Sequence, residues 1–175
     1  MLWAPWQTEP MPAAALVRLN VMATAVFTVS AVAAAVAFTD PWRVQGVVVA
    51  LGCFAIGVWV FLWGYWTAVQ RSRIDQIAVA QIYFLTHGVV PARQRRIMWA
   101  ALAVQCVVSL VTALARPNTD GQPGSTLAFG ILVPMLGLGL NGLLAAKHGR
   151  FTPRPGTTET VPPSDPEMEQ NAPHG

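Results

Sequence analysis

Long apolar runs separated by short polar segments dominate the pattern of the chain. Four of these runs match the roughly 20 helical residues needed to cross about 30 Å of hydrocarbon. They cover 14–38, 44–69, 97–115 and 127–146. The alternation that marks membrane β-strands does not occur in them, and lipid requires each backbone N–H to be satisfied internally. The pattern therefore predicts an all-α fold, a four-helix transmembrane bundle over residues 1–150.

Composition supports a membrane location for the chain. Hydrophobic residues make up 54% and charged residues only 11% of its 175 positions, against roughly 25% charged in an average soluble domain. This excludes a water-soluble globule, a disordered chain and, at a net charge of +3, a basic nucleic-acid binder. We expect the lipid bilayer to be the main partner.

The positions of the basic residues predict an orientation for the bundle. If both termini are cytoplasmic, the outer side carries only Arg43 and Arg116. The inner side then carries the other basic residues, namely Arg18, Arg71, Arg73, Arg93, Arg95, Arg96, Lys147, Arg150 and Arg154. Because cytoplasmic loops are enriched in Lys and Arg, we expect a multi-pass protein of the bacterial inner (plasma) membrane with both termini inside.

The segment between the second and third runs predicts an amphipathic helix over about 72–88 at the inner surface. Its apolar residues recur at spacings of three and four, which places them on one face. They are Ile74, Ala78, Ile82, Leu85 and Val89. A fifth span over 74–90 is the alternative, but it would carry Asp75 and His87 and send one arginine cluster outside.

The sequence also predicts the character of the two ends of the chain. A cleaved signal peptide could use Ala35-Val36-Ala37, but the long apolar run, with its first basic residue at Arg18, favours a retained helix. The arm before this run contains Trp3 and Trp6, which suit an interface anchor. The stretch 151–175 is rich in Pro, Thr and acidic residues and predicts a disordered cytoplasmic tail.

Three tryptophans share one face of the second run. Trp59, Trp63 and Trp66 lie at helical spacing. The preferred interpretation is anchoring at the lipid interface. The alternative is a stacking platform for an aromatic or cationic ligand.

Candidate catalytic chemistry is sparse in the sequence. No Asp, Glu, Lys or Arg lies near the middle of a span, which argues against proton-driven antiport of the kind that small multidrug exporters perform with a membrane-embedded Glu. The three histidines are scattered without metal-ligand spacing. We expect neither enzymatic activity nor a metal or cofactor. Thiol redox chemistry between Cys53 and Cys106, which lie at similar depth, is a weaker alternative.

A few residues inside the spans are candidates for helix packing or gating. Thr28 and Gln105 lie at similar depth, and we predict a hydrogen bond between them. Asn141 lies near the inner end of the last run. The same run carries Pro134 and Gly137, and its small residues predict a packing face against the Ala-rich first helix. A hinge or pathway lining is the alternative.

Arg93, Arg95 and Arg96 follow Pro91 at the start of the third run. At about 1 kcal/mol per basic residue near an anionic leaflet, they predict anchoring to anionic headgroups. A docking site for a partner is the second interpretation.

One segment resembles a known group of proteins. Gly130-Ile131-Leu132-Val133-Pro134-Met135 with Gly137-Leu138, followed by Lys147-His148-Gly149, is similar to a pattern in small four-span membrane proteins of high-GC Gram-positive bacteria. The resemblance covers about 25 residues and implies a location but no activity. The missing chemistry, together with the small-residue helix faces, favours a non-catalytic accessory or assembly subunit of an envelope complex, binding a membrane protein or a second copy. The alternative is a small oligomeric transporter or channel.

Overall fold

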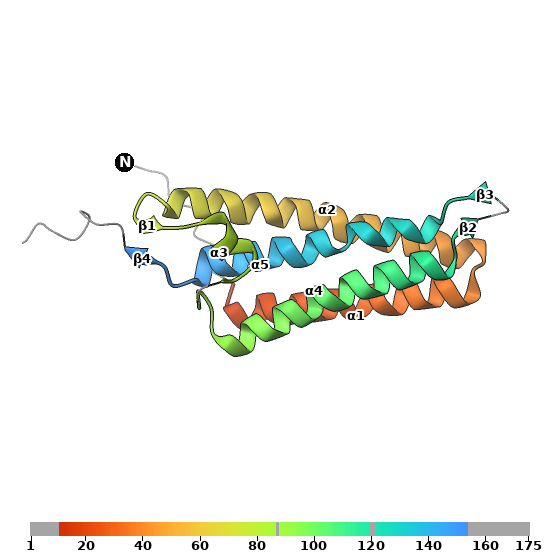
Figure 1. The fold of residues 1–175 in the computed structure, drawn as a ribbon, viewed down its shortest axis with the longest axis horizontal. Helices are drawn as coiled ribbons and strands as arrows, with labels where there is room; N and C mark the ends of the chain where they lie inside the picture. The colour runs from red at the N-terminus through yellow and green to blue at the C-terminus, as the bar shows by residue number, and fades with distance from the viewer. Residues whose placement is uncertain (1–10, 87, 120–121, 154–175) are drawn as a thin grey trace, which may run out of the picture.

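A computed structural model of the protein describes residues 11–86, 88–119 and 122–153. Four long helical segments lie side by side (Figure 1). They are α1 (Ala13–Ala37), α2 (Asp40–Arg71), α4 (Ala92–Ala115) and a last segment in which the 3-10 helix η1 (Thr126–Leu132) leads into α5 (Pro134–His148). Each is long and apolar enough to cross a membrane.

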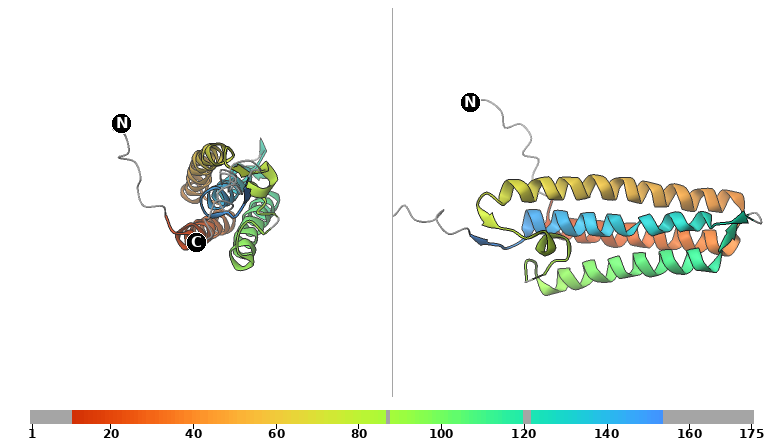
Figure 2. Two further views of the ribbon diagram at one scale, coloured as in Figure 1. Left: turned by 90° about the vertical axis from the view of Figure 1, so that its left-hand side faces the viewer. Right: turned by 45° about the horizontal axis from the view of Figure 1, so that its top comes forward.

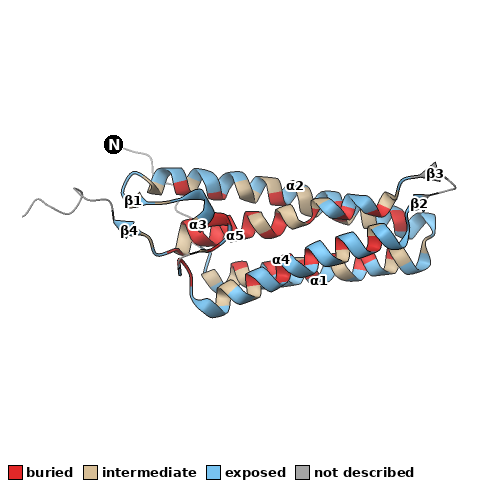
Figure 3. Ribbon diagram, viewed as in Figure 1, coloured by how far each residue is buried: buried red, intermediate tan, exposed pale blue. Residues whose placement is uncertain are grey.

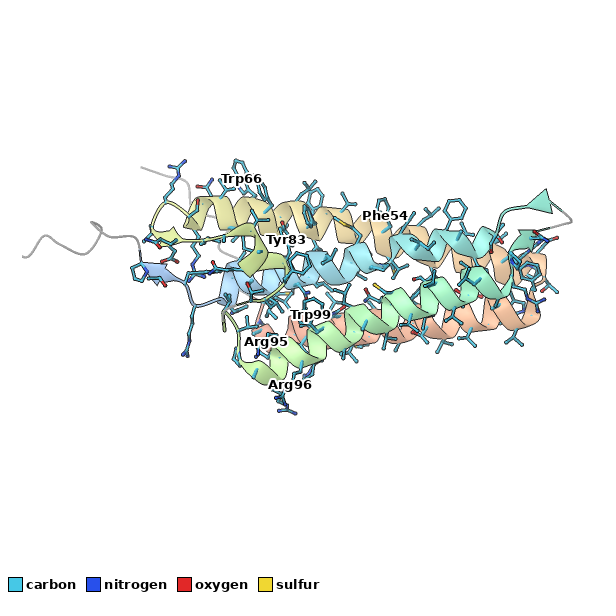
Figure 4. The ribbon with its side chains drawn as sticks, viewed as in Figure 1. Phe54, Trp66, Tyr83, Arg95, Arg96 and Trp99 are labelled. Carbon is cyan, nitrogen blue, oxygen red and sulfur yellow. The ribbon has the colours of Figure 1, made fainter. Side chains whose placement is uncertain are left out.

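The four predicted apolar helices are confirmed. The largest shifts are at the ends of α2 and α4, where polar residues extend the helix beyond the apolar run. As a result, Arg93, Arg95 and Arg96 belong to the start of α4 rather than to a loop before it. Figure 4 shows Arg95 and Arg96 at this end of the helix.

Helix α5 is the central element of the bundle. Every residue from Gly139 to Ala146 is buried, and the side chains of Leu140, Asn141 and Leu144 are fully so. Figure 3 shows α5 mostly buried where α2 is mostly exposed. The most extensive helix contacts join α2 to α5 and α1 to α4. Seen end-on, the helices pack together in a single bundle (Figure 2).

The outer surfaces of α1, α2 and α4 are strongly apolar. Large side chains such as Val29, Trp59 and Val107 are more than half exposed, and they continue along the length of the helices. A soluble protein rarely exposes so large a contiguous apolar surface. The surface is therefore compatible with a membrane protein.

The helix predicted over 72–88 is not formed as one element. The structure has instead a short strand β1 (Asp75–Gln76), the five-residue helix α3 (Val79–Tyr83) and a turn beyond it. Strand β1 pairs antiparallel with β4 (Thr152–Pro153), which draws the chain away from a helical path. Ile82, Leu85 and Val89 are buried in the core of the protein, whereas Ile74 and Ala78 of the predicted face are exposed.

This end of the bundle, which contains α3 and the first turn of α4, is called the basic end. Arg71 connects its parts: Nε donates to Asp75 Oδ2 at 2.7 Å and Nη1 donates to the carbonyl oxygen of Ala146 at 3.2 Å. Its guanidinium also lies over the ring of Phe151. The predicted tail is thus ordered at 151–153, and the rest of it, 154–175, lies outside the described residues, as do Trp3, Trp6 and His87.

The opposite end is called the hairpin end. Strands β2 (Asn118–Thr119) and β3 (Gln122–Pro123) pair there. Phe38 ends α1 in a left-handed conformation, and the guanidinium groups of Arg43 and Arg116 lie 5.3 and 4.9 Å from the centre of its ring. Both basic residues of this end therefore make local packing contacts.

Candidate functional site: a buried polar network

The principal polar site of the bundle surrounds Gln105 of α4. Its side chain is fully buried. Nε2 donates to Asn20 Oδ1 at 3.2 Å and to Thr24 Oγ1 at 2.7 Å, both on α1. Because both protons of the amide are used across the helix interface, Gln105 fixes the rotation and axial offset of α1 against α4.

The network continues to either side of this amide. Asn20 Nδ2 donates to the sulfur of Met98 at 3.3 Å, and the Thr24 hydroxyl donates to the Asn20 carbonyl at 2.7 Å. The Ser109 hydroxyl lies 2.5 Å from the Gln105 carbonyl and 2.7 Å from that of Gly130. Its single proton is therefore shared between α4 and η1, so three helical segments are joined.

The predicted hydrogen bond between Thr28 and Gln105 is wrong. Gln105 bonds to Thr24 and Asn20, which lie one and two turns before Thr28 on α1. The Thr28 hydroxyl has no partner in the described part of the chain. One helical turn is about 5.4 Å, so a modest axial offset between the helices accounts for the difference.

One hydrogen-bond acceptor of the network is unpaired among the described residues and faces α5. Gln105 Oε1 is buried and has no hydrogen-bond partner among the described residues. A Cβ placed on Gly137 would lie 2.7 Å from this oxygen and 3.0 Å from Leu102 Cδ1. Gly137 thus makes room for the end of the Gln105 side chain.

Asn141 forms a second polar contact, one turn further along α5. It is fully buried, and its Nδ2 donates to the carbonyl oxygen of Tyr83 at 3.2 Å. Its Oδ1, like Gln105 Oε1, has no partner in the residues described. Asn141 therefore holds α3 against the central helix.

Tyr83 completes the attachment of α3. Its hydroxyl donates to the Phe61 carbonyl at 3.3 Å, and the two rings stack with centroids 4.3 Å apart. Burial, with the nearby Tyr65 as a smaller cause, raises the pKa of Tyr83 to about 12. The phenol is therefore neutral and available as a donor throughout the physiological range.

The main packing partner of α5 is α2, whereas the sequence predicted the Ala-rich α1. A Cβ on Gly139 would lie 2.6 Å from the Gly57 carbonyl oxygen, and one on Gly64 would lie 2.9 Å from the Leu143 amide nitrogen. Pro134 occupies the first turn of α5, directly after the 3-10 segment. Of the glycines that follow, Gly139 faces α2, whereas Gly137 faces Gln105 of α4 and Gly142 faces the ring of Tyr83.

The remaining candidates lie apart from the network. Cys53 and Cys106 are free thiols, and Cys106 is exposed. Trp59, Trp63 and Trp66 are each at least half exposed on α2, and Lys147 Nζ lies 5.5 Å from the centre of the Trp63 ring. Among the described residues, no three His, Cys, Asp or Glu side chains are grouped as metal ligands.

The sequence interpretation missed Asn20, Ser109 and Tyr83. A signal for the first two was present, because Asn20 and Thr24 are four residues apart, as are Gln105 and Ser109. Polar residues at this spacing share a helix face, and two such pairs on different apolar helices indicate a polar seam. Tyr83 gave no comparable signal, since its contacts depend on the turn that follows β1.

Comparisons with known proteins provide no relative. No family model matches the chain, and neither a curated protein nor a solved structure is significantly similar to it.

Proposed function

We propose that the protein is a non-catalytic accessory or assembly subunit of a larger complex in the bacterial inner membrane, with both termini cytoplasmic. The observation that carries the proposal is that the side chain of Gln105 joins α4 to α1. This amide is fully buried and bonded to two side chains of α1. The polar groups at mid-depth therefore hold helices together, as expected of a scaffold.

The contacts of the arginines at the two ends of the bundle support this orientation. Arg43 and Arg116 at the hairpin end pack on Phe38, and Arg43 also pairs with Asp40. At the basic end, the exposed Arg93 and Arg96 make no ion pair with a described residue. Unpaired basic residues concentrated at one end agree with the positive-inside rule.

The exposed face of α2 is the surface that we assign to a membrane-protein partner. It carries a shallow hollow of about 230 Å³ lined by Trp59, Leu62, Trp63 and Trp66. The ring centroids of Trp59 and Trp63 lie 6.4 Å apart in an edge-to-face arrangement, so the lining of the hollow is largely aromatic. Aromatic residues of this kind dominate the energetics of protein interfaces.

Purification in mild detergent tests this proposal. The wild-type protein is expected to bring down a stoichiometric membrane partner, and Trp59→Ala combined with Trp66→Ala is expected to lose it. Leu19→Ala combined with Val26→Ala changes exposed apolar residues on α1 and is expected to retain it. A clean monomer from the wild type in several detergents would contradict the proposal.

A small oligomeric transporter is the second candidate, and a specific observation favours it. Gln105 Oε1 and Asn141 Oδ1 are both buried acceptors without a described partner. Gln105 Oε1 faces Gly137 of α5, and Asn141 belongs to the same helix. Unpaired polar groups inside a membrane bundle commonly mark a functional pathway. Flux of a solute into liposomes containing the protein, altered by Pro134→Ala, would support this candidate. Absence of flux across a broad solute panel would contradict it.

A further inference from the structure

Two adjoining surface hollows lie between α1 and α4, from the basic end toward the middle of the bundle, and are together called the groove. Their volumes are about 360 and 490 Å³, and Ile97 lines both of them. The first hollow has a basic rim, whereas the second is almost entirely apolar. The combination has the amphipathic character of a phospholipid.

The basic rim is formed by residues from both helices. Arg18 of α1 and Arg93 of α4 line the first hollow together with Gln94. Both arginines are exposed, and neither makes an ion pair with a described residue. The two acidic side chains in the described part of the chain, Asp40 and Asp75, are paired with Arg43 and Arg71. Among the described residues, no acidic side chain is left to neutralise the positive charge of the rim.

The second hollow continues from this rim along the helices. Its walls include Val21, Ala25 and Val29 of α1 and Ala100 and Val104 of α4. Ala25 and Ala100 are exposed and small, so they leave space beside the larger valines. From Arg18 to Val29 the helix rises about 16 Å at 1.5 Å per residue. This matches the roughly 15 Å depth of one leaflet of the hydrocarbon core.

We propose that this groove binds one anionic phospholipid of the cytoplasmic leaflet, with its phosphate between Arg18 and Arg93 and an acyl chain along the α1/α4 groove. The inference rests on the membrane orientation given under Proposed function. Guanidinium groups bind phosphate through paired N–H donors. The lipid covers the apolar floor of the groove and joins the two helices that Gln105 connects deeper in the bundle.

A specific site must be distinguished from the general attraction of a basic surface for anionic lipid. The chain offers a matched control for this purpose, because Arg73 and Arg150 are also exposed at the basic end. Neither of them lines the groove. The pair Arg18→Gln with Arg93→Gln and the pair Arg73→Gln with Arg150→Gln remove the same charge.

Native mass spectrometry of the full chain from nanodiscs containing equal phosphatidylglycerol and phosphatidylcholine tests the proposal. The wild-type protein is expected to retain one phosphatidylglycerol molecule in preference to phosphatidylcholine. The groove pair is expected to weaken this binding about 25-fold, at about fivefold per arginine, and the control pair is expected to retain it. Equal loss in both pairs, or no preference in the wild type, would overturn the proposal.

A second variant tests the acyl-chain part of the groove. Ala25→Leu with Ala100→Leu enlarges two lining side chains of the second hollow and leaves both arginines in place. This variant is expected to lose the bound lipid while remaining folded by circular dichroism. Retention of the lipid would contradict the groove. If the wild-type protein does not fractionate with membranes, the proposed membrane location is wrong. If it fractionates with membranes but shows no lipid preference, only the lipid site is wrong.

Discussion

Gly57 of α2 lies directly against the backbone of Leu136 on α5. A Cβ at position 57 would come within 2.6 Å of the Leu136 amide nitrogen and 2.7 Å of its Cα. Such an approach between backbones is possible only with glycine. Ala50, Gly57 and Gly64 follow one another at intervals of seven residues, and all three are buried. A seven-residue stripe of this kind keeps one face of a helix in continuous contact with its neighbour.

Gly57→Ala is therefore expected to destabilise the bundle by about 1–3 kcal/mol, the usual cost of overpacking. Unfolding in detergent, followed by circular dichroism, measures the change. Gly52→Ala provides the control on the same helix, because a Cβ there meets nothing within 4 Å. Equal stability of the two variants would contradict the close α2–α5 contact.

Coupling between Thr24 and Gln105 tests the polar network. A double-mutant cycle with Thr24→Ala and Gln105→Leu is expected to give a coupling free energy of about 0.6 kcal/mol, with about 1.7 as an upper value. The same cycle with Thr28→Ala is expected to give a value near zero, because Thr28 makes no bond to Gln105. Stronger coupling to Thr28 would show that the helices have a different offset.

Titration of Tyr83 tests the attachment of α3. The chain has two tyrosines, so Tyr65→Phe leaves Tyr83 as the phenol observed by ultraviolet absorbance. Its midpoint is expected to stay close to 12, although loss of Tyr65 removes the smaller of the two causes that raise the pKa. A midpoint near 10, the ordinary value for tyrosine, would show that the ring is not buried.

The raised pKa of Tyr83 also predicts how the stability of the folded protein changes at high pH. The folded-state pKa of about 12 exceeds the unfolded value of about 10, so the folded state holds this proton more tightly. The resulting stabilisation is complete below pH 10 and is lost as the pH rises to 12. Tyr83→Phe is expected to remove this part of the pH dependence, as measured by thermal unfolding.

The four long helices could be predicted because their apolar length is a local property of the sequence. The partner of Gln105 could not, because the choice among Asn20, Thr24 and Thr28 depends on the axial offset of two helices that are distant in the chain. The predicted helix over 72–88 failed for a related reason. Its apolar spacing was correct for Ile82, Leu85 and Val89, but the pairing of Asp75 with Pro153 involves a partner that local periodicity cannot reveal.

The packing partner of α5 was also beyond the sequence pattern. Small residues occur on α1, at Ala31 and Ala35, and on α2, at Gly57 and Gly64. Spacing alone indicates that each helix has a face able to pack closely. Which faces meet depends on the topology of the bundle, and here α2 rather than α1 is the main neighbour of α5.

The orientation of the bundle underlies both the proposed function and the lipid site, and cysteine labelling tests it most directly. In a Cys53→Ser, Cys106→Ser background, Asn118→Cys and Arg73→Cys each place one thiol at an exposed position, at the hairpin end and the basic end respectively. A membrane-impermeant maleimide applied to intact spheroplasts is expected to label Asn118→Cys at once and Arg73→Cys only after lysis. Labelling of Arg73→Cys in the intact spheroplasts, with Asn118→Cys protected, would contradict the orientation.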